Sequence, residues 1–175
     1  LLDPEPFTPR ALDLLDEQLR RALESRLIQP ADVQGLNWPT LEQARGKLLL
    51  ILDEGGSKRD WYYDNWQSRP MFTNAPEGHP AAGVMIINDP IEDFARIQRL
   101  VRAGYLVRTR ADANTFEARV NDTRRREQAF ASGAQAISTD YYLPASHFGN
   151  DYRVVIEGGI RCNPVLLLEA CVVAE

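Results

Sequence analysis

Short apolar segments that each end in polar residues recur along this chain, and their order constrains the fold more than any other feature. Four of them have the length of strands: residues 47–53, 84–87, 105–110 and 136–140. The first reads Lys-Leu-Leu-Leu-Ile-Leu-Asp, without polar alternation, which predicts a strand buried on both faces in a parallel sheet covered by helices. The polar residues at the four ends are Asp53; Asn88 and Asp89; Arg108, Arg110 and Asp112; and Ser138, Thr139 and Asp140.

Helical patterns precede the first strand. Thr8 and Pro9 predict a helix start, with Thr8 as the N-cap and Pro9 in the first turn. Leucines at helical spacing continue this amphipathic helix for roughly four turns. We expect it to end before Pro30, and a shorter helix to cover residues 40–44.

Two more helices are predicted between the last three strands. Residues 91–101 have helical spacing, and Gly104 suits the stop after them. Asn114, with Glu117 three residues later, resembles a capping box at the start of a basic helix that closes at Gly133. A helix followed by βα, βα, βα and β predicts an α/β fold, in one domain over residues 1–175. In such a fold the carboxyl ends of the strands share one rim, where ligands bind.

Composition narrows the class of protein. The 175 residues are 44% hydrophobic and 26% charged, the balance of a globular domain. No apolar run approaches the ~20 residues that cross a bilayer. The net charge of −5 does not indicate bulk attraction to nucleic acid. Cys162 and Cys171 are too few for a disulfide framework or a zinc site, and a single bridge between them is left open.

Several ordered motifs carry a family resemblance over nearly the whole chain. They are residues 45–53 (RGKLLLILD), 108–112 (RTRAD), 114–119 (NTFEAR), 121–122 (ND), 131–135 (ASGAQ), 138–141 (STDY) and 161–164 (RCNP). Together they resemble the calcium-dependent, phosphatidylinositol-specific phospholipase C-like family. The resemblance implies a TIM barrel that cleaves phosphodiesters: a hydroxyl of the inositol attacks phosphorus, histidines act as base and acid, and calcium neutralises developing charge.

Set against that family, the chain corresponds to the C-terminal half of the barrel, strands five to eight. A full barrel takes ~250 residues and eight βα units. The resemblance places the two catalytic histidines and most calcium ligands on strands one to four. Calcium is therefore implied with ligands outside this chain, and no catalytic residue is assigned, because His79 and His147 match no such motif. We expect an excised fragment that lacks its N-terminal half, and the resemblance implies a secreted or periplasmic protein.

Two arginines are the leading candidates for substrate binding. Arg108 and Arg110 share one strand face by the period of two, and a guanidinium matches phosphate oxygens in a planar fork. An internal ion pair with Asp112, Asp53 or Asp140 is the even alternative, because charges inside a barrel must be paired. Arg110 lies nearer the strand end and is the better candidate to face the ligand.

The remaining candidates lie at the same predicted rim. Asp53 and Asp140 end separate strands and could accept hydrogen bonds from sugar hydroxyls or orient an arginine; a helix cap or a buried salt bridge is the alternative. Asp112 completes the polar end of the third strand. Tyr141 follows the last strand and could stack on a ring, although packing is commoner. Residues 88–90 favour a turn and helix cap over a ligand.

Two further segments could lie at the surface and contact a partner. Aromatic residues at 61–66 (WYYDNW) are predicted in a loop that could dip into a membrane surface, or fold onto the barrel, which is the commoner outcome. Arginines at 119 and 124–126 are predicted on one helix with a solvated face.

Two other functions remain open. One is a non-catalytic module that binds an anionic sugar or lipid headgroup. The other is a glycerophosphodiester phosphodiesterase, because the strand end Thr139-Asp140 also resembles the last barrel strand of that family.

Overall fold

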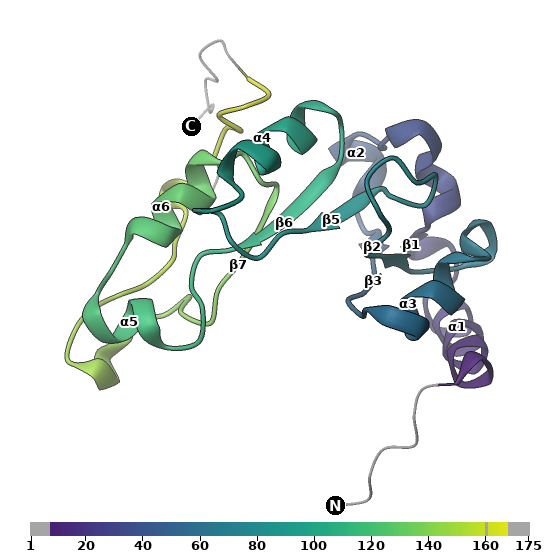
Figure 1. The fold of residues 1–175 in the computed structure, drawn as a ribbon, viewed down its shortest axis with the longest axis horizontal. Helices are drawn as coiled ribbons and strands as arrows, with labels where there is room; N and C mark the ends of the chain where they lie inside the picture. Colours follow the sequence, from purple (N-terminus) through teal and green to yellow (C-terminus); the bar gives the residue numbers. More distant parts are fainter. Residues whose placement is uncertain (1–7, 160, 168–175) are drawn as a thin grey trace, which may run out of the picture. The chain divides into compact units, whose positions relative to one another are not determined.

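Two compact units, residues 1–85 and 86–175, make up the chain (Figure 1). The structure is a computed structural model that describes residues 8–159 and 161–167, so Cys171 and any bridge from it to Cys162 lie outside the described residues. Each unit is mixed α/β with short parallel strands. The described strands do not close into a barrel. The expectation of one domain stays a prediction, and the units are described separately.

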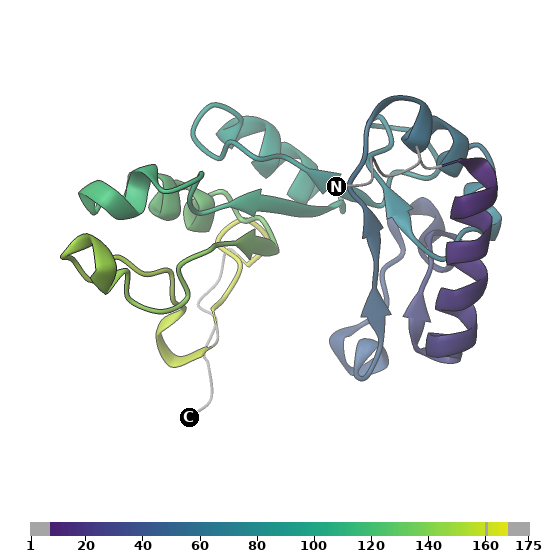
Figure 2. The ribbon, with the colours of Figure 1, turned by 90° about the horizontal axis from the view of Figure 1, so that it is seen from below.

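Unit 1 (residues 1–85) begins with the predicted amphipathic helix. α1 (Pro9–Leu23) has Thr8 as its N-cap, and the Thr8 hydroxyl accepts a hydrogen bond from the Ala11 amide at 3.2 Å. One face of α1 packs into the core through Leu12, which is fully buried with Tyr62 and Met71. Figure 2 shows α1 running along the side of this unit. The start of this helix is confirmed, and its apolar face positions the unit's strands and α3.

The other elements of unit 1 are short. They are the 3₁₀ turns η1 (Glu24–Arg26), η2 (Pro30–Leu36) and η3 (Trp66–Ser68), the helices α2 (Leu41–Ala44) and α3 (Gly56–Tyr63), and the strands β1 (Leu27–Ile28), β2 (Leu48–Leu49), β3 (Ile51–Leu52) and β4 (Phe72–Thr73). β1 pairs with β2, and β3 with β4, both in parallel. The short helix at 40–44 is confirmed, and its N-cap Thr40 forms a capping box with Gln43.

Residues 47–53 differ from the prediction of one fully buried strand. The run changes partner at Leu50: β2 pairs with β1, whereas the Leu50 carbonyl accepts from the Phe72 amide at 2.9 Å and β3 pairs with β4. Leu48 remains 42% exposed. The prediction of burial on both faces was therefore wrong, because neither two-stranded sheet covers both sides of this segment.

The aromatic segment at 61–66 is not the predicted loop. Residues 61–63 form the last turn of α3, and η3 begins at Trp66. Tyr62 is fully buried, whereas Trp61 is 40% exposed. Tyr62 therefore packs on the unit's own core, which was the alternative to membrane contact. In the part of the chain that the structure describes, no helix is long and apolar enough to span a bilayer.

Unit 2 (residues 86–175) contains a three-stranded sheet in the order β5-β6-β7, of which β5 (Val84–Ile86) spans the division between the units. β6 (Leu106–Arg110) and β7 (Ala136–Ser138) pair in parallel, with Arg110 opposite Ser138. The remaining elements are α4 (Phe94–Arg102), α5 (Phe116–Val120), α6 (Arg124–Ala131), η4 (Ser146–Phe148) and η5 (Glu157–Gly159). α4 and α6 both contact β6 (Figure 1). The order of these strands and of α4 confirms the prediction.

The predicted basic helix is two helices. α5 and α6 are separated by Asn121, which has the left-handed conformation (φ 52°). Asn114 is not the N-cap: Thr115 takes that position, and the Glu117 carboxylate accepts from the Ala113 amide at 2.9 Å. The stop at Gly133 is confirmed, with φ +78° and the side chain of Val165 where a Cβ would lie.

Candidate functional site

The two arginines of β6 share one face of the strand, as predicted. Side chains alternate along β6, so that Val107 and Thr109 are fully buried while Arg108 and Arg110 are only partly buried. Because α4 and α6 pack on β6, we assign the buried side chains to the helix-covered face. Arg108 and Arg110 then point to the opposite face, which is the interior face in a closed α/β barrel.

Arg108 is held by the end of the neighbouring strand. Its guanidinium donates to the Asn88 side-chain oxygen at 2.6 Å, and the Asn88 carbonyl accepts from the Arg125 guanidinium at 2.7 Å. Arg125 also forms an ion pair with Asp89 at 3.3 Å and is largely buried, so it does not belong to a solvated face as predicted. The sequence placed Asn88 at a strand end but favoured a turn over a site for residues 88–90; its contact with Arg108 adds Asn88 to the candidates.

Asp89 caps the turn that precedes α4, as predicted for a turn, whereas the N-cap of the helix itself is Asp93. Its carboxylate accepts hydrogen bonds from the Ile91 and Glu92 amides at 2.9 and 3.1 Å. Partial burial opposes the charged form, but these two hydrogen bonds and Arg125 outweigh it, and together they lower the pKa of Asp89. Asp89 therefore fixes the turn that carries Asn88.

Arg110 differs from Arg108 in its hydrogen bonds and ion pairs. Within residues 8–159 and 161–167, the Arg110 guanidinium forms no hydrogen bond or ion pair. The alternative of an internal ion pair with Asp112, Asp140 or Asp53 therefore does not describe Arg110. A partly buried guanidinium with uncommitted N–H donors is suited to a planar anion such as a phosphate.

Asp112 and Asp140 lie at the adjoining ends of β6 and β7. Asp112 is only 2% exposed, and its carboxylate accepts from the Asp140 amide at 3.1 Å and from the Thr139 hydroxyl. The Asp140 side chain is exposed. We call the set Asn88, Arg108, Arg110, Asp112 and Asp140 the strand-end cluster. All five lie on or just after β5, β6 and β7; Arg108 bonds Asn88, and Asp112 bonds Asp140, whereas the Arg110 side chain bonds none of the other four.

Tyr141 and Asp53 take other positions. The Tyr141 ring is 9% exposed and packs edge-on against Tyr152 with 5.6 Å between centroids, in a cluster with Ala111, Ala118 and Ala145. Packing, the commoner outcome, is thus what the structure shows for this ring. Asp53 belongs to unit 1, where its carboxylate accepts from Asn74 at 2.7 Å, and both follow the paired strands β3 and β4.

Tyr152 is hydrogen-bonded to the backbone next to Asp112 of the strand-end cluster. It is 1% exposed, and its hydroxyl donates to the Ala111 carbonyl at 3.3 Å. Burial raises the pKa of Tyr152, and the negative charge of Asp112 adds to that effect. Tyr152 therefore stays neutral and serves as a hydrogen-bond donor beneath the cluster.

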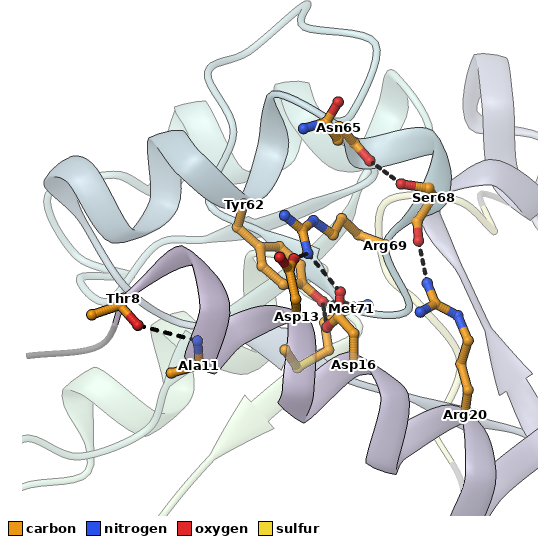
Figure 3. Close-up of polar contacts among 10 residues, drawn as sticks. All are labelled: Thr8, Ala11, Asp13, Asp16, Arg20, Tyr62, Asn65, Ser68, Arg69 and Met71. Atoms are coloured by element: carbon orange, nitrogen blue, oxygen red, sulfur yellow. Dashed lines mark hydrogen bonds and ion pairs between the residues drawn. The ribbon is translucent and has the colours of Figure 1, made fainter.

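A second polar network lies in unit 1 (Figure 3). Arg69, 9% exposed, donates to Asp13 at 2.6 Å and to Asp16 at 2.9 Å, and its guanidinium lies over the Tyr62 ring. The Tyr62 hydroxyl donates to the other Asp16 oxygen at 2.5 Å. These contacts join α1, α3 and the start of β4, so the network holds the unit's elements together.

The described residues offer few clustered donor groups for a metal ion. Among the described residues, no three or more histidine, cysteine, aspartate or glutamate side chains come together to hold a metal. The side chains described here therefore do not form the calcium site that the resemblance implies.

The fold and the strand-end cluster define a class of protein: an α/β protein with cationic and acidic side chains at the ends of parallel strands. A family model described as phosphoinositide phospholipase C, Ca²⁺-dependent, matches residues 1–164. The chain belongs to this family, as its motifs indicated. No curated protein and no solved structure matches it.

Proposed function

We propose that this chain forms the substrate-binding half of a phosphodiester hydrolase that acts on a phosphoinositide-like substrate. Family membership supports the reaction class. The observation that carries the assignment to this chain is the guanidinium of Arg110, which makes no hydrogen bond or ion pair among the described residues and lies at the end of β6. Arg110 is opposite Ser138, two residues before the exposed Asp140. Together Arg110 and Asp140 offer donors for phosphoryl oxygens and an acceptor for inositol hydroxyls.

Arg108 and Arg110 have different parts in this proposal. Arg110 donates to the phosphoryl oxygens and stabilises the charge that builds up on them as a hydroxyl attacks phosphorus. Arg108, held by Asn88 at 2.6 Å, adds positive charge from a fixed position. Asp140 orients the sugar ring.

The proposal also covers the fold of the whole protein, which we take to be a barrel. The chain supplies the C-terminal half of a phospholipase C-like barrel, and the face of β6 that carries Arg108 and Arg110 belongs to the barrel interior. Support comes from the family and from the alternation along β6, which leaves those two side chains on the face away from α4 and α6.

Calorimetry with inositol 1-phosphate tests the binding role of Arg110. Arg110→Ala should weaken binding by a factor of about ten to a hundred, because a charge-assisted hydrogen bond contributes about 1.5–3 kcal/mol. Arg102→Ala is the matched control, since Arg102 is an exposed arginine of α4 that bonds Gln98 at 3.3 Å. It should bind as wild type does.

Separate titrations with inorganic phosphate and with myo-inositol test the phosphate-binding and the sugar-binding parts of the site in turn. Arg110→Ala should reduce the binding of phosphate, and Asp140→Asn that of inositol. Equal affinity of wild type and Arg110→Ala for inositol 1-phosphate would contradict the proposed function. Binding without turnover in the protein that carries both halves of the barrel would instead favour a non-catalytic module.

A further inference from the structure

Asp112 joins the ends of two strands from a buried position. Asp112 is only 2% exposed, and its two carboxylate oxygens accept hydrogen bonds from different donors. Oδ1 accepts from the Asp140 amide at 3.1 Å, and Oδ2 accepts from the Thr139 hydroxyl. Hydrogen bonds to an ionised carboxylate are among the stronger ones in proteins. Both oxygens of Asp112 are thus engaged within the protein, with little surface left for a ligand.

The three residues that follow β7 are anchored through this contact. The Tyr141 amide donates to the Thr139 hydroxyl oxygen at 2.9 Å, so the same hydroxyl links Asp112 and Tyr141. The Tyr141 carbonyl accepts from the Val154 amide at 2.8 Å, and its ring is in the buried aromatic cluster. Asp140 therefore has an anchored residue on each side, and only its side chain is exposed.

The chain around Arg110 is fixed from the same place. Ala111 is fully buried; its amide donates to the Ser138 carbonyl at 2.9 Å, and its carbonyl accepts from the Tyr152 hydroxyl at 3.3 Å. Asp112 follows directly. It is two residues from Arg110 in sequence and one hydrogen bond from the backbone of Asp140.

We propose that Asp112 is a positioning residue that sets the placement of Asp140 relative to Arg110, rather than a group that touches substrate. The inference rests on the proposed phosphoester site and deepens it. A displacement of about 1 Å in a group that binds or orients substrate is enough to lower activity by orders of magnitude. A buried carboxylate that holds both strand ends is therefore as necessary to the site as the side chains it places.

Three substitutions separate positioning from general stability. Asp112→Ala removes both carboxylate oxygens, which are the acceptors for the Asp140 amide and the Thr139 hydroxyl. Thr139→Val removes that hydroxyl, and Thr139→Ser restores it. The matched control is Ser132→Ala: Ser132 is fully buried in unit 2 and its hydroxyl donates to the Ala129 carbonyl at 2.7 Å, so its loss destabilises the unit without touching the strand ends.

Two measurements are made on each variant of the full chain: hydrogen exchange of the Asp140 and Tyr141 amides by NMR, and the affinity for inositol 1-phosphate by calorimetry. Asp112→Ala should speed exchange at Asp140 about tenfold or more and weaken binding to a similar extent. Thr139→Val should do the same at Tyr141. Thr139→Ser and Ser132→Ala should leave both readouts within about twofold of wild type, since neither removes a strand-end contact.

The outcomes distinguish this inference from the function it rests on. If wild type does not bind inositol 1-phosphate, the proposed function fails, and exchange at Asp140 still reports whether Asp112 holds that residue. If exchange at Asp140 is unchanged in Asp112→Ala, the positioning role is overturned whether or not the ligand binds. If exchange rises but affinity stays within about twofold of wild type, Asp112 is structural only.

Discussion

The arginine side chains of this protein differ in role because they have different hydrogen-bond partners. Arg108 and Arg110 lie two residues apart on one face of β6, yet Arg108 bonds Asn88 at 2.6 Å while Arg110 has no such contact among the described residues. In unit 1, one guanidinium nitrogen of Arg69, Nη1, donates to both Asp13 and Asp16. The availability of donors, rather than charge alone, therefore distinguishes a binding arginine from a structural one.

Tyr62 offers a prediction at this scale. Burial, together with the hydrogen bond to Asp16 and its negative charge, raises the pKa of Tyr62 far above its ordinary value, so the hydroxyl stays protonated as a donor. It also accepts from the Met71 amide at 3.3 Å. Tyr62→Phe leaves both partners short of a hydrogen bond and should lower the free energy of unfolding by about 1–3 kcal/mol, measured by chemical denaturation.

Tyr63→Phe is the matched control for that measurement. Tyr63 is the next residue of α3 and is partly buried, and its hydroxyl forms no hydrogen bond among the described residues. Its removal should change the free energy of unfolding by less than about 0.5 kcal/mol. Equal losses in the two variants would show that the Tyr62 hydroxyl has no special role.

At the scale of elements, the turn between β5 and α4 depends on the charge of Asp89. Its pKa is lowered in the folded chain, so its stabilising contribution is present above the ordinary value of 3.8 and is lost as pH falls through the lower, folded value. Asp89→Asn keeps an oxygen that can accept from the Ile91 and Glu92 amides but loses the ion pair with Arg125. We expect it to cost about 0.5–1 kcal/mol near neutral pH, because a partly exposed pair is screened.

The pH profile gives the sharper test of Asp89. Between about pH 5 and about pH 3, wild type should lose more stability than Asp89→Asn, so the two unfolding curves should converge as the acid form is reached. Asp151→Asn serves as the control, because Asp151 is exposed and its side chain makes no hydrogen bond or ion pair with the described residues. Parallel pH profiles for wild type and Asp89→Asn would refute a role for the charge.

Elements with strong local signals were predictable from the sequence. α1, α4 and β6 have caps, spacing or alternation that act within a few residues, and each formed as expected. β1 and β4 are two residues long and exist only through pairing with β2 and β3, which no local pattern encodes. The break between α5 and α6 depends on one left-handed Asn121. The contact of Asn88 with Arg108 joins positions 20 apart and likewise required the fold.

At the scale of the whole molecule, the strand-end cluster holds the groups that we propose to bind and orient a phosphoester, and it contains no histidine. Asp112 is engaged on both oxygens, and the two histidines have other contacts: His79 accepts from the Ala81 amide at 3.1 Å, and His147 packs on Phe148 with 4.0 Å between ring centroids. Cleavage of a phosphodiester by an inositol hydroxyl needs a base and an acid within hydrogen-bond reach of the reacting oxygens.

We therefore expect the 175-residue chain to bind inositol 1-phosphate and yet leave phosphatidylinositol intact, because it supplies orientation without proton transfer. Phosphorus NMR of phosphatidylinositol in detergent micelles, with calcium added, would show whether a cyclic or open inositol phosphate forms. Adding a segment that carries the two histidines of the family should restore cleavage, and Arg110→Ala should suppress that restored activity. Turnover by the chain alone, abolished by His147→Ala, would mean that this half carries its own base and that the division of roles between two halves of a barrel is wrong.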